Sequence, residues 1–385
     1  MATVFLAPSS FTGENLVEIT THGGLRAPTS VLAAAIRAGA RQAEPGEFTR
    51  RAVLNGKLDL LQAEAVGDLI ESCSTAAQRQ ALRQLDGGLS ERVLALREHI
   101  LHVEALLAYD IDFPEEDDGP IPRERIIQAA QAALENVRAL LATANHGTLI
   151  HDGLLVVLAG APNAGKSSLF NALLGEARAI VTEIPGTTRD AIEAVFDRPL
   201  WPLRLVDTAG LRETTDPLER MGIETSTRYV GRAALVLACA ESVTSVTEVT
   251  RLVSEHTSAP IIGLLTKADL VTNREQLKEG VLPVSARTGE GLSALLEAID
   301  RRLVAEHGMR HDETPGLTRA RHQRAVANAV VELDAFLRAL EHGVLPMSIA
   351  AIHIRQAADA LGELIGVLHT EDVLDVVFRQ FCVGK

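Results

Sequence analysis

Apolar residues recur with two different periods along the chain, and the change of period separates its parts. Between residues 151 and 306, short apolar runs alternate with segments whose apolar residues are spaced as on one face of a helix. The apolar runs are 154–159, 203–206, 234–238, 261–265 and 282–284. Continuous apolar runs of this length are typical of strands buried on both faces. The alternation therefore predicts a mostly parallel sheet with helices on both faces, which we expect over residues 151–306.

Helical spacing dominates on both sides of this stretch. Before it, apolar residues in 58–73 and in 126–141 are spaced as one face of a helix. A long helix is expected between them, over 76–108. After it, the same spacing recurs in 326–340, and a further helix is expected over 348–367. We predict an all-α helical domain made of 54–150 and 307–385, with the α/β domain inserted into it.

The first 53 residues are mixed in character. Short strands are expected near 4–6 and 16–20, followed by a helix over 27–38 that Gly39 would end. So few elements bury little apolar surface. We expect a partial α+β domain, residues 1–53, that depends on further sequence, a ligand or a partner chain.

Composition excludes several classes of protein. Among the 385 residues no run approaches the ~18 apolar residues of a membrane span, and no signal peptide is expected. The three cysteines are far apart, which favours a reducing compartment, so we expect a cytoplasmic protein. A net charge of −14 and only 3% aromatic residues argue against a protein that coats nucleic acid or stacks its bases.

A glycine-rich turn lies where the first expected strand meets a helix. Residues 160–168 match the pattern G-x-x-x-x-G-K-[ST], whose backbone N–H groups surround phosphates at a helix N-terminus. Lys166 is expected to reach the β- and γ-phosphates, and Ser167 to hold Mg²⁺. The expected phosphate-binding residues are Asn163, Ala164, Gly165, Lys166, Ser167 and Ser168.

Further motifs follow in the order that a GTP site needs. Asp207 ends an expected strand and suits Mg²⁺, and Asp269 can accept both N–H groups of the guanine edge, which adenine lacks. Taken alone, each carboxylate is more often a surface group, so the ordered set carries the prediction of GTP over ATP. Its expected GTP-binding residues are Thr187, Thr188, Asp207, Thr208, Ala209, Gly210, Thr266, Lys267, Asp269, Ser285, Ala286 and Arg287.

Two positions depart from the usual guanine-nucleotide pattern. Thr266 stands where such sites usually carry Asn, and without an amide to brace the loop we expect weaker guanine affinity. No Gln follows Gly210 to place the attacking water. From the residues alone, Glu213 and Glu219 are both candidates for that role.

The motifs together resemble the MnmE (TrmE) family of tRNA modification GTPases over essentially the whole chain. The segments that carry the resemblance are 10–14, 45–49, 55–65, 160–168, 186–190 and the terminal Cys-Val-Gly-Lys, 382–385. The resemblance implies an N-terminal folate-binding domain that dimerises, a helical domain, and a GTPase domain inserted into it. Since the family has further sequence before Phe5, we expect an N-terminally truncated chain that begins within the folate-binding domain.

The resemblance also implies the reaction. It predicts a potassium-dependent GTPase that forms a homodimer and a heterotetramer with an FAD-dependent MnmG-type protein. Together these would add an aminomethyl or carboxymethylaminomethyl group to the wobble uridine of tRNA. The one-carbon unit would come from a 5-formyl or 5,10-methylene tetrahydrofolate derivative. K⁺ would take the place of an arginine finger between paired GTPase domains.

Carried over residue by residue, the resemblance assigns individual roles. The K⁺ ligands would be Asn163, Thr182, Ile184 and Thr187, with Thr182 also in the GTP site; the Mg²⁺ ligands would be Ser167 and Thr188; the folate-binding residues would be Glu18, Lys57 and Lys385. Glu219 rather than Glu213 would orient the water. Cys382 would be needed for modification, although a lone cysteine is more often simply buried.

Two other interpretations remain beside this one. An RNA-binding assembly factor would usually carry a basic module, which the acidic balance of this chain disfavours. A degenerate scaffold would bind GTP and modify nothing. A comparison of wobble uridine in cells with and without the gene distinguishes the three.

Overall fold

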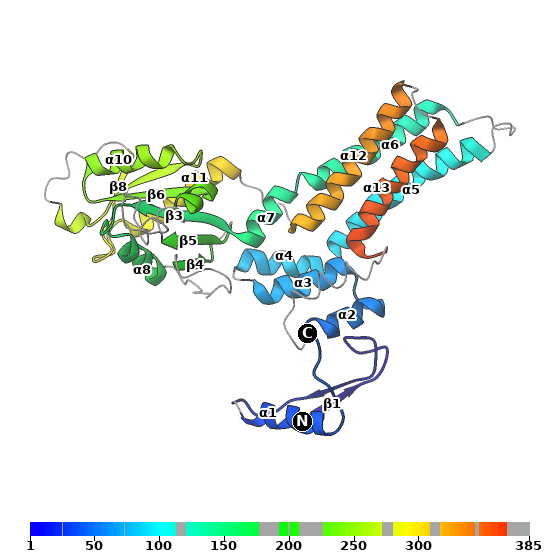
Figure 1. Ribbon diagram of the computed structural model, residues 1–385, viewed down its shortest axis with the longest axis horizontal. Helices are drawn as coiled ribbons and strands as arrows, with labels where there is room; N and C mark the ends of the chain where they lie inside the picture. The colour runs from blue at the N-terminus through cyan, green and yellow to red at the C-terminus, as the bar shows by residue number, and fades with distance from the viewer. Residues whose placement is uncertain are drawn as a thin grey trace, which may run out of the picture. The chain divides into compact units, whose positions relative to one another are not determined.

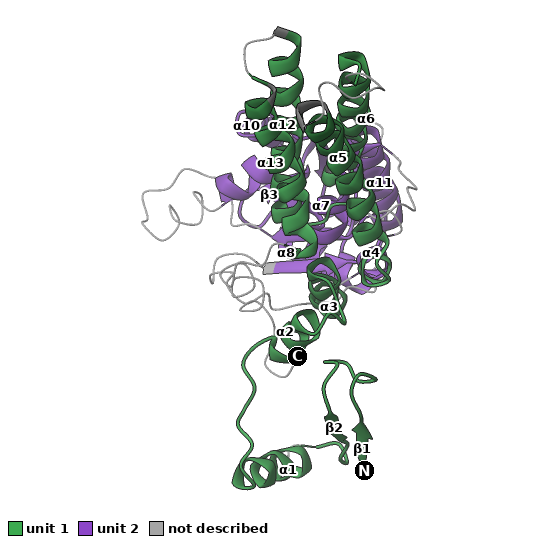
Figure 2. Ribbon diagram, turned by 90° about the vertical axis from the view of Figure 1, so that its right-hand side faces the viewer, with its two compact units in different colours: residues 1–71, 81–144, 314–385 green, residues 72–80, 145–313 purple. Residues whose placement is uncertain are grey.

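The computed structural model describes residues 1–24, 26–72, 74–112, 121–176, 192–198, 201–207, 226–271, 280–308, 316–342 and 346–367. The chain divides into two compact units, which Figure 2 colours separately. The helical unit comprises 1–71, 81–144 and 314–385, and the α/β unit comprises 72–80 and 145–313. The chain therefore leaves the helical unit twice and returns to it twice.

A six-stranded sheet forms the centre of the α/β unit, in the order β4-β5-β3-β6-β7-β8. The strands are β3 (Leu154–Gly160), β4 (Ile192–Phe196), β5 (Leu203–Asp207), β6 (Leu235–Ala240), β7 (Ile261–Leu265) and β8 (Val281–Pro283). β3 pairs in parallel with β5 and β6, and β7 continues the parallel pairing from β6 to β8. The predicted mostly parallel sheet is confirmed.

Helices cover both faces of this sheet (Figure 1). Alternate residues of β3 point to opposite faces, and both sets are buried. Leu154, Val156 and Leu158 pack with α8 (Lys166–Glu176) and α11 (Leu292–His307). Val157 and Ala159 pack on the other face, with α10 (Val243–Ser254). Burial on both faces explains why this strand reads as one continuous apolar run.

β4 is a strand that the apolar pattern of the sequence does not predict. It lies at the edge of the sheet and pairs antiparallel with β5, from Ile192 opposite Asp207 to Phe196 opposite Leu203. Its sequence, Ile-Glu-Ala-Val-Phe, has no strict alternation of apolar and polar residues. The pairing with β5, rather than a local pattern, therefore makes this segment a strand.

Four long helices form the core of the helical unit (Figure 1). They are α5 (Gly88–Asp112), α6 (Arg123–Leu141), α12 (Ala320–His342) and α13 (Met347–Ile365). α12 packs on α6 and α13, and α5 packs on the same two helices. Ile100, Ile126, Phe336 and Ile354 are fully buried between them. Within the described part of the chain, no helix is both long and apolar enough to cross a membrane.

Three shorter helices accompany these elements. α3 (Leu60–Glu71) and α4 (Thr75–Leu85) precede α5, and α7 (Ala144–Asp152) leads into β3. The expectation of one helix over 76–108 is wrong, because α4 ends at Leu85 and α5 begins at Gly88. Gly87 has a φ of 91°, a left-handed conformation that favours glycine and interrupts the helix.

The N-terminal segment has little core of its own. β1 (Ala2–Phe5) pairs antiparallel with β2 (Leu16–Ile19), and α1 (Arg26–Arg37) and α2 (Glu47–Leu54) follow. α1 has no buried residue, and Val4 and Val17 are 62% and 58% exposed. The described elements therefore bury little apolar surface by themselves, as expected from their small number.

Candidate nucleotide-binding site

The glycine-rich turn follows β3 directly and leads into α8. A Cβ atom on Gly160 would lie 2.2 Å from the carbonyl oxygen of Cys239 in β6, so only glycine allows the two strands to pair here. Asn163 and Gly165 have φ angles of 64° and 81°. Asparagine is one of the few residues other than glycine that tolerates this left-handed conformation. The sequence of the turn thus fits its backbone at three positions.

Lys166 is held at this turn. Its side chain is buried, and its Nζ donates to the carbonyl oxygens of Gly160 at 3.1 Å and Ala161 at 3.0 Å. Burial lowers the pKa of Lys166, and the nearby charge of Asp207 opposes that effect. The ammonium group therefore lies beside the backbone that the motif uses for phosphate.

Asp207 ends β5 next to the same turn. It is in register with Leu158 of β3, and its Oδ1 atom is buried with no hydrogen-bond partner among the described residues. A buried carboxylate oxygen of this kind fits a cation or the water bound to one. Ser167 adds an exposed hydroxyl in the first turn of α8. These hard oxygen atoms suit Mg²⁺.

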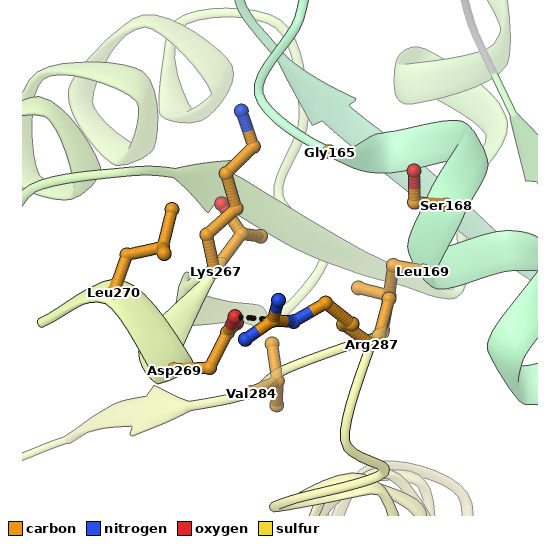
Figure 3. A pocket seen from close by; sticks show the side chains of 10 residues that line it. Gly165, Ser168, Leu169, Lys267, Asp269, Leu270, Val284 and Arg287 are labelled. Carbon is orange, nitrogen blue, oxygen red and sulfur yellow. Dashed lines mark ion pairs between the residues drawn. The ribbon is translucent and has the colours of Figure 1, made fainter.

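A cavity of about 280 Å³ lies beside this turn and contains Asp269 (Figure 3). Asp269 Oδ1 accepts a hydrogen bond from Ser285 Oγ at 2.7 Å, and its Oδ2 lies 3.0 Å from Arg287 Nε. The Ser285 hydroxyl lowers the pKa of Asp269, and the charge of Arg287 adds to this effect. The carboxylate is therefore ionised and fixed in orientation, as an acceptor for two N–H groups must be.

Thr266 connects this cavity to the phosphate-binding turn. Its hydroxyl is buried, 2.8 Å from the carbonyl oxygen of Ala164 and 3.0 Å from that of Ala240. The expectation that a residue without an amide leaves the loop unbraced is wrong, because the hydroxyl makes the link itself. The effect of Thr266 on guanine affinity stays a prediction.

Three residues that line the cavity are not predicted from the sequence. They are Leu169, Leu270 and Val284, and Leu270 is 68% exposed. Leu270 could have been found from its place directly after Asp269, whereas no local pattern distinguishes Leu169 in α8 or Val284 after β8. Lys267, which is predicted, also lines the cavity; it has a φ of 52° and forms an ion pair with Glu241, the residue after β6.

The other predicted site residues lie outside the cavity and the phosphate-binding turn, or outside the described residues. Those outside the described residues are Thr182, Ile184, Thr187, Thr188, Thr208, Ala209, Gly210, Glu219, Cys382 and Lys385. Glu18 is exposed on β2. Lys57 Nζ donates to the carbonyl oxygen of Pro8 at 3.1 Å, and no hydrogen bond or ion pair between described residues joins Lys57 to Glu18.

Comparison with known proteins identifies the family. The model of the MnmE helical domain matches residues 60–382, and that of the GTP-binding protein TrmE N-terminus matches residues 1–57. The tRNA modification GTPase MnmE of Aquifex aeolicus is 42% identical over an alignment of 386 positions, which covers 99% of this chain and 85% of that protein. The chain belongs to the MnmE family. The MnmE of Heliobacterium modesticaldum is also 42% identical, over 99% of this chain and 84% of its own.

Membership of the MnmE family makes this chain a tRNA modification GTPase. Among solved structures, the G domain of the T. maritima FeoB iron transporter covers 39% of this chain and 98% of its own, with 30% identity and a TM-score of 0.32. Because that score is low, the assignment rests on the MnmE relatives and the family models.

Proposed function

We propose that this chain hydrolyses GTP to drive the modification of tRNA at its wobble uridine. The added group is aminomethyl or carboxymethylaminomethyl, and an FAD-dependent MnmG-type protein is the partner. The observation that carries the proposal is the match to MnmE over 99% of the chain. The ionised Asp269 beside a phosphate-binding turn supports it independently, because it gives the chain a guanine acceptor.

The chain's own residues have distinct roles toward GTP. Lys166 neutralises the β- and γ-phosphates, and Asp269 accepts the two N–H groups of guanine. Ser167 and Thr188 would hold Mg²⁺, with Asp207 reaching it through water. Mg²⁺, when bound, neutralises charge on the β- and γ-phosphates.

Hydrolysis also needs positive charge beside the β–γ bridge and a positioned water. Glu219 orients the water in this proposal. Asn163 would hold K⁺ together with Thr182, Ile184 and Thr187; K⁺, when bound, supplies the positive charge. The support within the structure is that the Asn163 side chain is exposed on the phosphate-binding turn and has no hydrogen bond among the described residues.

The remaining assignments follow from the family. We propose a folate-binding and dimerising domain over 1–53, a helical domain over 54–150 and 307–385, and a GTPase domain over 151–306 inserted into it. Glu18, Lys57 and Lys385 would contact a tetrahydrofolate derivative, and Cys382 would serve the modification. A homodimer would form a heterotetramer with the MnmG-type protein, and we expect the reaction to take place in the cytoplasm.

GTP turnover in matched salts tests the nucleotide site. We expect faster turnover in KCl than in NaCl at the same ionic strength. Glu219→Ala should keep nucleotide affinity and lose turnover. Equal rates in both salts would remove the role of K⁺, and unchanged turnover in Glu219→Ala would return the water-orienting role to Glu213 or another residue.

Analysis of tRNA tests the function as a whole. Deletion of the gene should remove the wobble-uridine modification, and the intact gene should restore it. A gene carrying Lys166→Ala should fail to restore it, since the phosphates would lose their cation. Normal wobble uridine in the deletion strain would contradict the proposed function.

A further inference from the structure

The first residue of the connection between β4 and β5 holds the first turn of α4. Thr75 donates twice to Asp197, the residue after β4: its backbone N–H to Oδ1 at 3.1 Å, and its hydroxyl to Oδ2 at 2.5 Å. Both residues belong to the α/β unit. A carboxylate at a helix N-terminus satisfies free N–H groups and interacts favourably with the helix dipole. The start of α4 is thus fixed to this connection.

The described residues of this connection, 197–198 and 201–202, contact two other helices of the α/β unit. Arg198 forms an ion pair with Asp300 of α11. Trp201 is buried with edge contacts to His146 of α7 and to His307 of α11, at centroid distances of 6.3 Å each. Since α7 begins and α11 ends near the points where the chain enters and leaves the α/β unit, the connection is anchored at that side of the unit.

The opposite end of this strand pair is at the nucleotide site. Asp207, the candidate residue for the Mg²⁺ water, pairs with Ile192, and at the other end Leu203 pairs with Phe196. The ladder spans about 13 Å at the usual rise of a strand. Ala194 and Leu205 are buried in the sheet core, so the strand pair can shift only as part of it.

The last turn of α4 is held within the helical unit. Gln62 of α3 donates to the carbonyl oxygen of Leu85 at 2.9 Å. Gln84 is fully buried; it donates to the carbonyl oxygen of Leu61 at 3.0 Å and accepts from the Thr318 hydroxyl at 3.4 Å. The end of α4 is therefore tied to α3 and to the segment that leads into α12.

A buried ionic cluster continues from α3. Glu64 accepts from Arg321 through two bonds of 3.0 Å each and is paired with His322. Arg321 also donates to the carbonyl oxygens of Glu363 at 3.3 Å and Leu364 at 3.5 Å, at the end of α13. A shift of α3 would disturb these contacts, and the buried Glu64 has little access to water that could replace its partners.

We propose that α4 transmits the nucleotide state of the α/β unit to the helical unit, with Asp197 and Thr75 as its positioning residues. This inference rests on the proposed function only in assuming that the signal serves tRNA modification. The path through α4 does not depend on that function. α4 is continuous from Thr75 to Leu85, with residues up to 80 in the α/β unit and from 81 in the helical unit. A helix moves as one body because each turn is hydrogen-bonded to the next.

Hydrogen exchange on the full chain tests the route. Wild-type protein is compared without nucleotide and with Mg²⁺ and a non-hydrolysable GTP analogue. We expect nucleotide-dependent exchange at 81–85, and Asp197→Ala should lose it while keeping the change in α8. Glu255→Ala is the matched control, since it removes a carboxylate that pairs with Arg251 elsewhere in the α/β unit. The proposal would be overturned if exchange at 81–85 does not depend on nucleotide in wild type. It would also be overturned if the dependence on nucleotide is retained in Asp197→Ala.

Two further measurements separate this proposal from the proposed function. Trp201 is the only tryptophan of the chain, so its fluorescence reports the β4–β5 connection, and it should respond to nucleotide in Asp197→Ala as in wild type. Asp197→Ala should retain GTP turnover and lose wobble-uridine modification. Thr75→Ser, which keeps both donors, should retain both activities, and Thr75→Val should behave as Asp197→Ala does. Wild-type protein without modification activity would reject the proposed function, while the exchange experiment would still decide the route.

Discussion

Asn163 has two possible roles: it tolerates the left-handed backbone conformation of the turn, and its side chain is a proposed ligand of K⁺. Its φ of 64° favours glycine or asparagine, and its side chain is exposed on the phosphate-binding turn. Either requirement alone would explain an asparagine. Variants that keep the backbone and remove the amide can separate the two.

The first prediction concerns this residue. Asn163→Gly should keep the fold and nucleotide affinity but lose the advantage of KCl over NaCl, because glycine accepts the left-handed backbone and has no amide oxygen. Asn163→Ala should lose the same advantage and about 1 kcal/mol of stability, the cost of the backbone conformation. Thermal melting and GTP turnover measure both. A KCl advantage retained in Asn163→Gly would show that the side chain has only a backbone role.

The second prediction concerns the role of Asp269 in binding guanine. Asp269→Asn should weaken GTP binding about a hundredfold or more, since a hydrogen bond to a charged group is worth about 1.5–3 kcal/mol and guanine donates two. Xanthosine triphosphate should bind the variant better, because its additional carbonyl accepts from the new amide. Arg287→Ala is the control; its side chain is 77% exposed, and we expect a smaller loss. Titration with fluorescent nucleotides measures the affinities, and equal losses in the two variants would contradict the assignment.

At the scale of elements, the close pairing of β3 and β6 depends on a single glycine. Gly160 ends β3 where it meets Cys239 of β6. Cys239 is fully buried, and burial raises the pKa of its thiol to about 12, so it is a neutral packing residue. The two strands have no room for an added carbon here.

The third prediction compares two glycines. Gly160→Ala should destabilise the protein by about 1–3 kcal/mol, as inserted carbon atoms do in packed cores, and should weaken nucleotide binding. Gly175→Ala in α8 meets nothing within 4 Å and should stabilise by about 0.5–1 kcal/mol, because alanine favours a helix. Thermal melting of both variants tests this pair. Similar melting temperatures for the two would show that β3 and β6 can separate at little cost.

Element boundaries show where the sequence was insufficient. The parallel strands were predicted because burial on both faces makes each one a continuous apolar run. β4 was missed because its pairing partner, β5, determines it. The break between α4 and α5 was missed because the conformation of Gly87 is a backbone property that a helical apolar pattern does not reveal.

At the scale of the whole molecule, the ionic cluster around Glu64 joins segments more than 250 residues apart in sequence, as the separation of 257 between Glu64 and Arg321 shows. Burial alone would raise the pKa of Glu64, but the charges of His322 and Arg321 outweigh it and lower that pKa well below its ordinary value. The ionised carboxylate therefore stabilises the fold.

The fourth prediction follows from this cluster. Glu64→Gln should destabilise the protein by about 3–5 kcal/mol, because it leaves the buried His322 and the half-buried Arg321 without their anionic partner. Glu104→Gln, which removes an exposed pair with Arg355, should cost less than about 1 kcal/mol. Denaturant unfolding measures both. Equal effects of the two substitutions would show that the buried pair contributes no more than a surface pair.

The same cluster determines how the stability of the fold should change with pH. The folded-state pKa of Glu64 lies below the ordinary 4.5, so its stabilisation is fully present above that pH and is lost as the pH falls toward the folded-state value. The stability difference between wild type and Glu64→Gln should therefore shrink below about pH 4.5. A difference that grows on acidification would contradict the sign.

The sequence by itself determined the order of the motifs, the types of most strands and helices, and the family. These follow from local rules: the spacing of apolar residues, and the need for glycine, lysine and a hydroxyl at fixed positions in a phosphate-binding turn. Only the tertiary structure decided that Thr266 braces that turn, that Asp197 holds α4, and that Glu64 meets Arg321. Each of these contacts joins residues far apart in the chain, and their chemistry becomes specific only when folding removes water from around them.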